Sequence, residues 1–261
     1  SNRSALRRAL ETSQPQTVFH LAGLLRAAQY EELYRANLLG TIALFETLAE
    51  LGQKPLVILA SSSAVYGLSS GAKPLTEKSP LRPLTHYAVS KAAQETAALR
   101  FFDAQGIPLV VLRMFNLLGP GQPSQLAFSA WAKQIVRAEK NGGGEILTGS
   151  LDSSRDFVDV RDAVRALDLA AEKALPGEVY NVCSGRAVTM RECLDILLSL
   201  SPHPIQARLD PSRLQKDDIP VQVGGSRKFS RLTGWKPQIS LAQSLADLLD
   251  DWRRRIELEL E

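Results

Sequence analysis

The chain has 261 residues, of which 44% are hydrophobic and 23% charged, and its 31 Lys and Arg against 28 Asp and Glu give a net charge of +3. An intrinsically disordered chain would have fewer apolar residues and more net charge. A membrane-spanning helix would need about 20 uninterrupted apolar residues, whereas the longest apolar run, 107–118, is broken by Arg113. The composition therefore indicates a globular protein with enough chain for one large domain or two small ones.

The basic sequence pI of about 8.9 raises the question of nucleic-acid binding. The basic residues are scattered, and their one run, at 253–255, falls at the end of a predicted helix, where cations are favoured. Two cysteines, Cys183 and Cys193, do not make a disulfide framework, and three histidines supply no set of metal ligands. Residues 1–6 lack the apolar core of a signal peptide. We expect a cytoplasmic protein with no metal and with neither nucleic acid nor membrane as a partner.

In the first half, short apolar runs alternate with helix-length patterns. After a helical stretch at 4–10, strands are predicted at 17–22, 56–60 and 107–114, and helices at 30–51 and 87–105. Buried strands separated by helices are typical of βαβ crossovers and a parallel sheet. The fold class is therefore predicted as α/β, a Rossmann-like parallel sheet flanked by helices.

Beyond residue 120 the pattern becomes less regular, with three glycines at 142–144 and a loop at 149–154. Strands are predicted at 145–148 and 157–160, and helices at 161–173, 189–200, 227–233 and 240–255, the last with Ser240 as its cap. We expect two parts, a portion of a dinucleotide-binding domain at 1–120 and a small mixed α/β substrate-binding part at 121–261. Segments within 145–182 are expected to return to the main sheet.

Tyr87 and Lys91 are four residues apart on a predicted helix and so share one face. A phenol with a pKa near 10 is a poor acid–base catalyst at neutral pH, but a neighbouring cation lowers that pKa. Such a pair can exchange a proton with an alcohol or ketone oxygen. Alone, the spacing also fits a solvated pair on a helix surface.

Hydroxyl groups follow the strand at 56–60, where Ser61, Ser62 and Ser63 lead to Ala64-Val65-Tyr66-Gly67. Ligands of α/β sheets bind at the carboxyl ends of strands, so a serine there could polarise a carbonyl beside Tyr87. The alternative is that these serines only end the strand and cap the next turn.

Together these segments resemble the extended short-chain dehydrogenase/reductase family, which comprises nucleotide-sugar epimerases, dehydratases and reductases. The resemblance covers about 15–252 and rests on several segments in order: His20-Leu21-Ala22-Gly23, Asn37-Leu38-Leu39-Gly40-Thr41, Ser61 to Gly67, Tyr87-Ala88-Val89-Ser90-Lys91, Arg113-Met114-Phe115-Asn116, Gly119-Pro120-Gly121-Gln122 and Arg155-Asp156-Phe157-Val158-Asp159-Val160.

The resemblance implies a role for each matching residue. Tyr87 is the expected general acid/base, Lys91 holds the nicotinamide ribose and tunes Tyr87, and Ser62 binds the reacting oxygen. The expected residues of an NAD or NADP site are Leu21, Ala22, Gly23, Ala60, Ser61, Tyr87, Lys91 and Met114. The expected substrate residues are Ser62, Ser63, Asn116, Lys133, Arg155 and Asp218. Asn116 and Asn37 could instead brace loops, and Arg155 could pair with Asp156 or Asp159.

Ala64 stands where the family's sugar 4,6-dehydratases have a glutamate that helps remove water, so dehydratase activity is not expected. Residues 210–221 and 234–237, with Lys133, are similar to reductases of GDP-4-keto-6-deoxymannose, which make GDP-rhamnose. Gln215 and Lys216 replace the Arg-Pro usual in that group, although Arg213 or Lys216 could substitute. A nucleotide-sugar 4-epimerase, or a catalytically silent nucleotide-sugar-binding module, remains an alternative. The resemblance also implies a homodimer formed through the helices at 30–51 and 87–105.

The family's glycine-rich phosphate-binding turn, Gly-x-x-Gly-x-x-Gly, does not occur before His20. Residues 1–120 therefore resemble the later portion of such a domain, and the strand at 17–22 is expected to form an exposed edge. We accordingly expect this chain to bind dinucleotide weakly or not at all.

Overall fold

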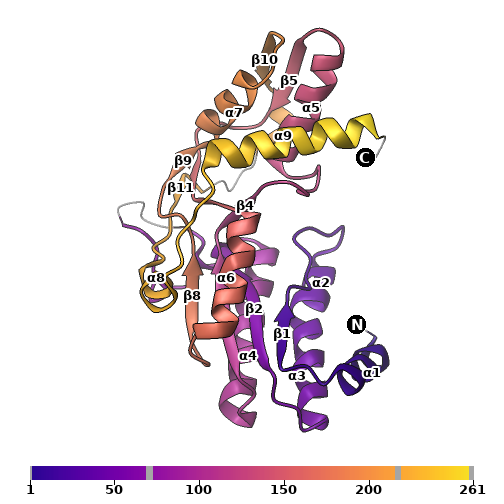
Figure 1. Ribbon diagram of the computed structural model, residues 1–261, viewed down its shortest axis with the longest axis vertical. Coiled ribbons are helices and arrows are strands. Elements are labelled where there is room, and N and C mark those ends of the chain that lie inside the picture. Colours follow the sequence, from indigo (N-terminus) through magenta and orange to yellow (C-terminus); the bar gives the residue numbers. More distant parts are fainter. Residues whose placement is uncertain (1, 69–72, 215–218, 259–261) are drawn as a thin grey trace.

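The computed structural model describes residues 2–68, 73–214 and 219–258. Its largest sheet has four parallel strands in the order β1-β2-β3-β8. These strands are β1 (Thr17–His20), β2 (Leu56–Ser62), β3 (Leu109–Met114) and β8 (Val179–Val182). Figure 1 shows them side by side in the lower half of the molecule, surrounded by helices. The predicted α/β class with a Rossmann-like parallel sheet is confirmed.

Alternation along the central strands produces two cores, one on each face of this sheet. Val57 and Leu59 of β2 point to the face covered by α1, α3 and α4, whereas Ile58 points to the face covered by α6 and α8. This strict two-residue period explains why a nearly all-apolar strand serves both faces. The helices of this part are α1 (Arg3–Ser13), α2 (Tyr30–Leu33), α3 (Gly40–Glu50), α4 (His86–Gln105), α6 (Val160–Lys173) and α8 (Arg227–Thr233).

The predicted helix at 30–51 contains a π-helical segment, η1 (Tyr34–Leu39), between α2 and α3. Asn37 is fully buried within it, and its side-chain amide forms hydrogen bonds with the backbone of Leu24 and with Ser90 of α4. π-Helical turns inside α-helices are often found at functional sites. The apolar periodicity of the sequence does not reveal this π-helical turn, because the helix continues on both sides of it.

Strand β1 lies at the edge of the four-stranded sheet, as expected. It ends at His20, two residues earlier than predicted, and Phe19 and Leu21 are 42% and 58% exposed. Strand β3 begins only after Pro108, whose missing N–H excludes it from a central ladder.

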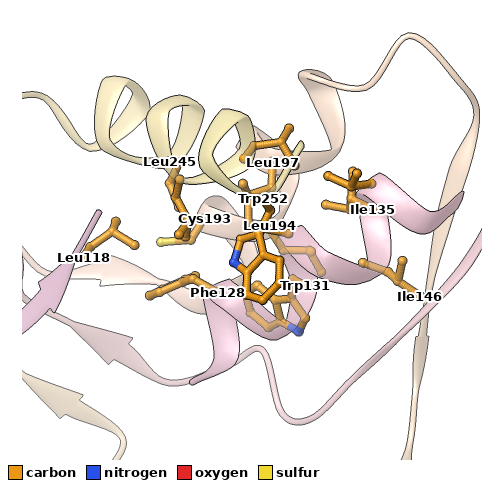
Figure 2. Close-up of a cluster of buried hydrophobic side chains, with 14 of the residues drawn as sticks. Leu118, Phe128, Trp131, Ile135, Ile146, Cys193, Leu194, Leu197, Leu245 and Trp252 are labelled. Carbon is orange, nitrogen blue, oxygen red and sulfur yellow. The ribbon is translucent and has the colours of Figure 1, made fainter. Parts of the chain in front are cut away.

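The second part, in the upper half of Figure 1, is built around a separate hydrophobic core. Helices α5 (Ala127–Lys140), α7 (Met190–Ser199) and α9 (Leu241–Glu257) enclose it. Figure 2 shows Trp131, Leu197 and Trp252 meeting there from these three helices. Helix α9 begins after Ser240, whose side chain accepts the N–H of Gln243 as the predicted cap. Helix α5 was not predicted.

The remaining short strands form small ribbons separate from the main sheet. Strand β4 (Asn116–Leu118) pairs with β7 (Phe157–Asp159), β5 (Gly144–Thr148) with β10 (Ile205–Leu209), and β6 (Ser154–Arg155) with both β9 (Val188–Thr189) and β11 (Val221–Gln222). The one-turn helices are η2 (Ser63–Tyr66) and η3 (Pro211–Arg213).

The expectation that segments within 145–182 return to the main sheet needs correction. Strand β8 does so, but β5 forms a separate sheet with β10. The reason is that Ile146 of β5 is buried in the second core. In the described ranges, no helix is both long and apolar enough to cross a membrane.

Candidate active site

A cavity of about 1200 Å³ opens at the carboxyl ends of β2 and β3 and is lined by residues of both parts. Ser62, Tyr87 and Lys91 line it from the main sheet, and Asn116 and Arg155 line it from the ribbons. Strand ends of a parallel sheet are the usual ligand site of this architecture. This volume exceeds the roughly 300 to 1000 Å³ usual for small-molecule pockets.

Helix α4 brings Tyr87 and Lys91 to this cavity. Its N-cap, Thr85, accepts the N–H of Ala88, so the helix starts just before Tyr87. Tyr87 forms a hydrogen bond with Ser62 at the end of β2. The Lys91 ammonium donates to the Ala60 carbonyl at 2.6 Å. The structure thus brings together all three predicted catalytic residues.

The protonation states differ from the simple expectation for this pair. Burial raises the pKa of Tyr87, and only its hydrogen bond with Ser62 opposes the shift. The sequence predicts that Lys91 lowers the pKa of Tyr87. In the structure the Lys91 ammonium donates to the Ala60 carbonyl instead, and the effect of burial on the Tyr87 pKa is the larger one. Burial also lowers the pKa of Lys91 to about 8, against the opposing charge of Glu95. At neutral pH, Tyr87 is therefore a protonated phenol one turn from a cation.

The predicted cofactor residues form one wall of the cavity. Leu21, Gly23, Ala60, Ser61 and Met114 line it, whereas Ala22 does not. Asn37 braces this wall, since its amide accepts from Leu24 N at 2.8 Å and donates to Leu24 O at 3.0 Å and to Ser90 Oγ at 2.8 Å. The loop-bracing interpretation of Asn37 is therefore the one observed.

Only glycine fits at position 23, because a Cβ built there would lie 2.7 Å from Asn37 Oδ1. Without a side chain, the backbone of Gly23 is exposed at this wall. Exposed backbone and the Lys91 ammonium are groups that a nicotinamide ribose can use. The residues present therefore fit the nicotinamide end of a dinucleotide.

Ser63 lines the cavity next to Ser62, and Asn116 and Arg155 line what we call its second wall. Asn116 Nδ2 donates to the Asp156 carbonyl at 3.0 Å, and Arg155 donates to the Ser154 carbonyl at 2.9 Å and to the Ile219 carbonyl.

The two carboxylates once considered as Arg155 partners have other partners. Asp159 pairs with Arg161, and buried Asp156 accepts from Ser184, Gly185 and Gly224. Arg155 itself lines the cavity.

One predicted substrate residue, Lys133, is not brought to the cavity, and another, Asp218, lies outside the described residues. Lys133 Nζ lies over the Trp252 ring, 5.6 Å from its centroid, and Lys133 is not among the residues that line the cavity. The positive charge lies over an aromatic face because both side chains project from α5 and α9, which pack together. Asp218, and Gln215 and Lys216 with it, lie outside the described residues. Arg213 does line the cavity, held by Asp210 at 3.0 Å.

Sequence reasoning missed two residues beside the site. Gln222 of β11 lines the cavity, accepts from Ser63 Oγ at 3.1 Å and donates to the Ser63 carbonyl at 3.2 Å. Nothing local in the sequence links it to a serine 159 positions earlier. Glu95 is buried one turn beyond Lys91. The same four-residue spacing that singled out Lys91 could have identified it. The described residues contain no cluster suited to a metal ion.

Comparison with known proteins places this cavity in context. Residues 1–183 match the model of the NAD dependent epimerase/dehydratase family. GDP-6-deoxy-D-mannose reductase of Pseudomonas aeruginosa is 33% identical over 251 residues, which cover 94% of this chain and 83% of that protein.

Two solved structures are also similar. The structure of RMD from Pseudomonas aeruginosa complexed with NADPH has a TM-score of 0.89 and 31% identity, covering 97% of this chain and 86% of its own. UDP-glucose 4-epimerase from Thermotoga maritima with UDP-glucose has a TM-score of 0.88 and 25% identity, covering 98% and 82%.

Proposed function

Because the chain belongs to the NAD dependent epimerase/dehydratase family, we propose that it reduces the C4 ketone of a nucleotide-linked 4-keto-6-deoxy sugar. The proposed substrate is GDP-4-keto-6-deoxymannose and the product GDP-rhamnose. Support for the GDP-linked substrate comes from the relative named GDP-6-deoxy-D-mannose reductase.

The observation that carries this proposal is the protonated Tyr87 phenol, hydrogen-bonded to Ser62 at the cavity wall. A phenol whose pKa is raised by burial keeps its proton at neutral pH, which suits donation to an oxygen that is becoming an alkoxide. Ser62 would orient that oxygen, and the Lys91 ammonium would stabilise the phenolate left behind. When bound, NADPH or NADH would supply the reducing equivalents.

The substrate would be oriented by the second wall and by Ser63. Arg155 would bind the diphosphate, since a guanidinium can bond two oxygens at once. Asn116 and Ser63 would contact the sugar. Ala64, also at the wall, offers no proton for the elimination of water.

A 4-epimerase is the second candidate, favoured by the similarity to the epimerase structure with UDP-glucose. It would use the same Tyr87 but regenerate its cofactor in every turnover. A silent nucleotide-sugar-binding module, the third candidate, would use Arg155 and Asn116 without chemistry.

One assay separates these three functions. The purified chain is incubated with GDP-4-keto-6-deoxymannose and millimolar NADPH, and absorbance at 340 nm is followed alongside product analysis by mass spectrometry. Substrate-dependent NADPH oxidation with a product 2 Da heavier supports the reductase. Interconversion of a UDP-hexose with its C4 epimer, without net oxidation, supports the epimerase. Sugar-nucleotide binding by calorimetry with neither reaction supports the binding module.

The weak dinucleotide binding expected from the sequence stays a prediction. Titration with NADPH in a calorimeter tests it, and a micromolar dissociation constant would contradict it. We also propose a cytoplasmic homodimer, supported by free, buried Cys183 and Cys193 and by exposed Leu39 and Val89 on the helices expected to pair. Light scattering measures its mass.

We further propose that residues 1–120 bind the dinucleotide and 121–261 mainly the substrate. Ser62, Tyr87 and Lys91 line the cavity from the first range, and Arg155 and Gln222 line it from the second, which supports that division.

A further inference from the structure

Glu95 of α4 is a buried charge that the proposed reaction does not use. It is 2% exposed and lies one helical turn beyond Lys91. Its carboxylate pairs with Arg113 of β3, with Arg113 Nη2 at 2.7 Å and Nε at 3.0 and 3.1 Å. A guanidinium fork that bonds both carboxylate oxygens makes a strong, well-defined ion pair. This buried ion pair therefore lies one helical turn from the Lys91 ammonium.

Glu95 also contacts the end of β2, where it accepts a hydrogen bond from Ser61 Oγ. Ser61 lies between two residues that touch the reacting pair. The Ala60 carbonyl accepts from Lys91 Nζ, and Ser62 is bonded to Tyr87. One carboxylate thus holds the backbone stretch from which both contacts arise.

Arg113 in turn is anchored on its far side. Its Nη1 donates to Tyr66 Oη at 3.0 Å and to the Glu77 carbonyl at 3.3 Å, and Tyr66 donates to Asn181 Oδ1 at 2.6 Å. The guanidinium therefore has partners on every side. This network prevents Glu95 from turning away from α4.

A purely structural role is the competing explanation. Buried ion pairs, however, contribute little net stability, because desolvation offsets their attraction. The Glu95–Arg113 ion pair also accepts a hydrogen bond from Ser61, so we infer a role beyond stability.

We propose that Glu95 is a positioning residue for the Tyr87–Lys91 pair. It fixes the Ala60–Ser62 stretch through Ser61 and holds a negative charge one turn from the Lys91 ammonium, so that Lys91 stays protonated. The inference rests on the proposed function only in taking Tyr87 and Lys91 as the reacting pair.

The charged and titratable groups around Lys91 are few among the described residues. Tyr87 and Glu95 share its helix, His20 faces it from β1, and Arg113 of β3 stands behind Glu95. Burial, with the Lys91 charge, lowers the pKa of His20 to about 4, so His20 is neutral at physiological pH. Glu95 is thus the group that opposes the effect of burial on Lys91.

The test measures the titration of Lys91 directly, by NMR of the full chain labelled with ¹³C at lysine Cε. The Lys91→Met variant identifies the signal. In Glu95→Gln, which keeps the size of the side chain, we expect the Lys91 pKa to fall by on the order of one unit. Ser61→Ala is the matched control, because it removes the hydroxyl bond but keeps the charge, and the pKa should stay near 8.

Loss of folding in Glu95→Gln would not end the test. The double variant Glu95→Gln/Arg113→Met removes both buried charges, a change that proteins often tolerate. The Lys91 pKa should still fall, by less than in Glu95→Gln, because the more distant Arg113 charge is lost as well. An unchanged Lys91 titration in a folded variant would overturn the positioning role.

This measurement needs neither cofactor nor substrate, so it separates the two proposals. A shifted titration alongside an inactive wild-type chain would count against the reductase and support the role of Glu95. In an active chain, Glu95→Gln should move the alkaline fall of kcat/KM to lower pH, whereas Ser61→Ala should lower kcat without that displacement.

Discussion

The two walls of the cavity are built in opposite ways. The wall carrying Ser62, Tyr87 and Lys91 comes from one strand and the helix that follows it, and its side chains are packed against a four-stranded sheet. The wall carrying Arg155 and Gln222 comes from two-residue strands whose partners are far apart in the sequence. In the proposed function, the chemistry resides on the regular part of the molecule, while the ligand contacts reside on the short strands.

Replacing Tyr87 should have the largest effect. Without the phenol proton, turnover of the Tyr87→Phe variant should fall by about 10²- to 10⁴-fold, the usual contribution of a general acid. Calorimetric binding of GDP-mannose should be unchanged, because the phenol hydroxyl belongs to the chemical wall. Tyr34→Phe is the matched control, since Tyr34 bonds His86 outside the cavity. If affinity for GDP-mannose fell as much as turnover, chemistry and substrate binding would not be separated between the two walls.

Arg155→Ala should show the reverse pattern. A hydrogen bond from a charged donor contributes about 1.5 to 3 kcal/mol, so affinity for GDP-mannose should weaken roughly 10- to 100-fold while kcat changes little. Titration calorimetry and steady-state kinetics measure the two quantities. Arg208→Ala, at an exposed site on β10, should leave both unaltered. If Arg155→Ala binds GDP-mannose as tightly as the wild type, Arg155 does not bind the diphosphate.

Gln222 joins the walls and tests how independent they are. Its two hydrogen bonds with Ser63 hold the turn that follows Ser62. Gln222→Ala should lower kcat by about 5- to 10-fold, in keeping with roughly 1 kcal/mol for a neutral hydrogen bond, and should raise KM as well. Gln206→Ala on exposed β10 serves for comparison. An effect on KM alone would mean that the substrate wall does not act on the serine turn.

The smallest effect concerns pH. The pKa of Lys91 is lowered to about 8, so its ammonium is present below that pH and is lost as pH rises through it. We therefore expect kcat/KM to decline above pH 8 and to be steady between pH 6.5 and 7.5. A pH profile of initial rates measures this limb. If kcat/KM keeps rising to pH 9.5, the positive charge of Lys91 takes no part in the reaction.

The same contrast decides how much could be predicted. The parallel sheet and the Tyr87–Lys91 face follow from local periodicity, because apolar runs and four-residue spacing are written in adjacent residues. Gln222 could not be predicted, since its contact with Ser63 depends on how a two-residue strand docks. Helix α5 was missed although Phe128, Trp131 and Ile135 follow a helical period. The raised pKa of Tyr87 needed the structure, because burial, which no spacing reveals, outweighs the hydrogen bond with Ser62.

The most direct test of the central claim is product formation from GDP-4-keto-6-deoxymannose and NADPH by the wild-type chain and by Tyr87→Phe, followed by mass spectrometry. We predict a GDP-linked 6-deoxyhexose 2 Da heavier than the substrate with the wild type, and at least a hundredfold less with Tyr87→Phe. Equal product from both chains, or none from a wild-type chain that binds the sugar nucleotide and NADPH, would contradict it.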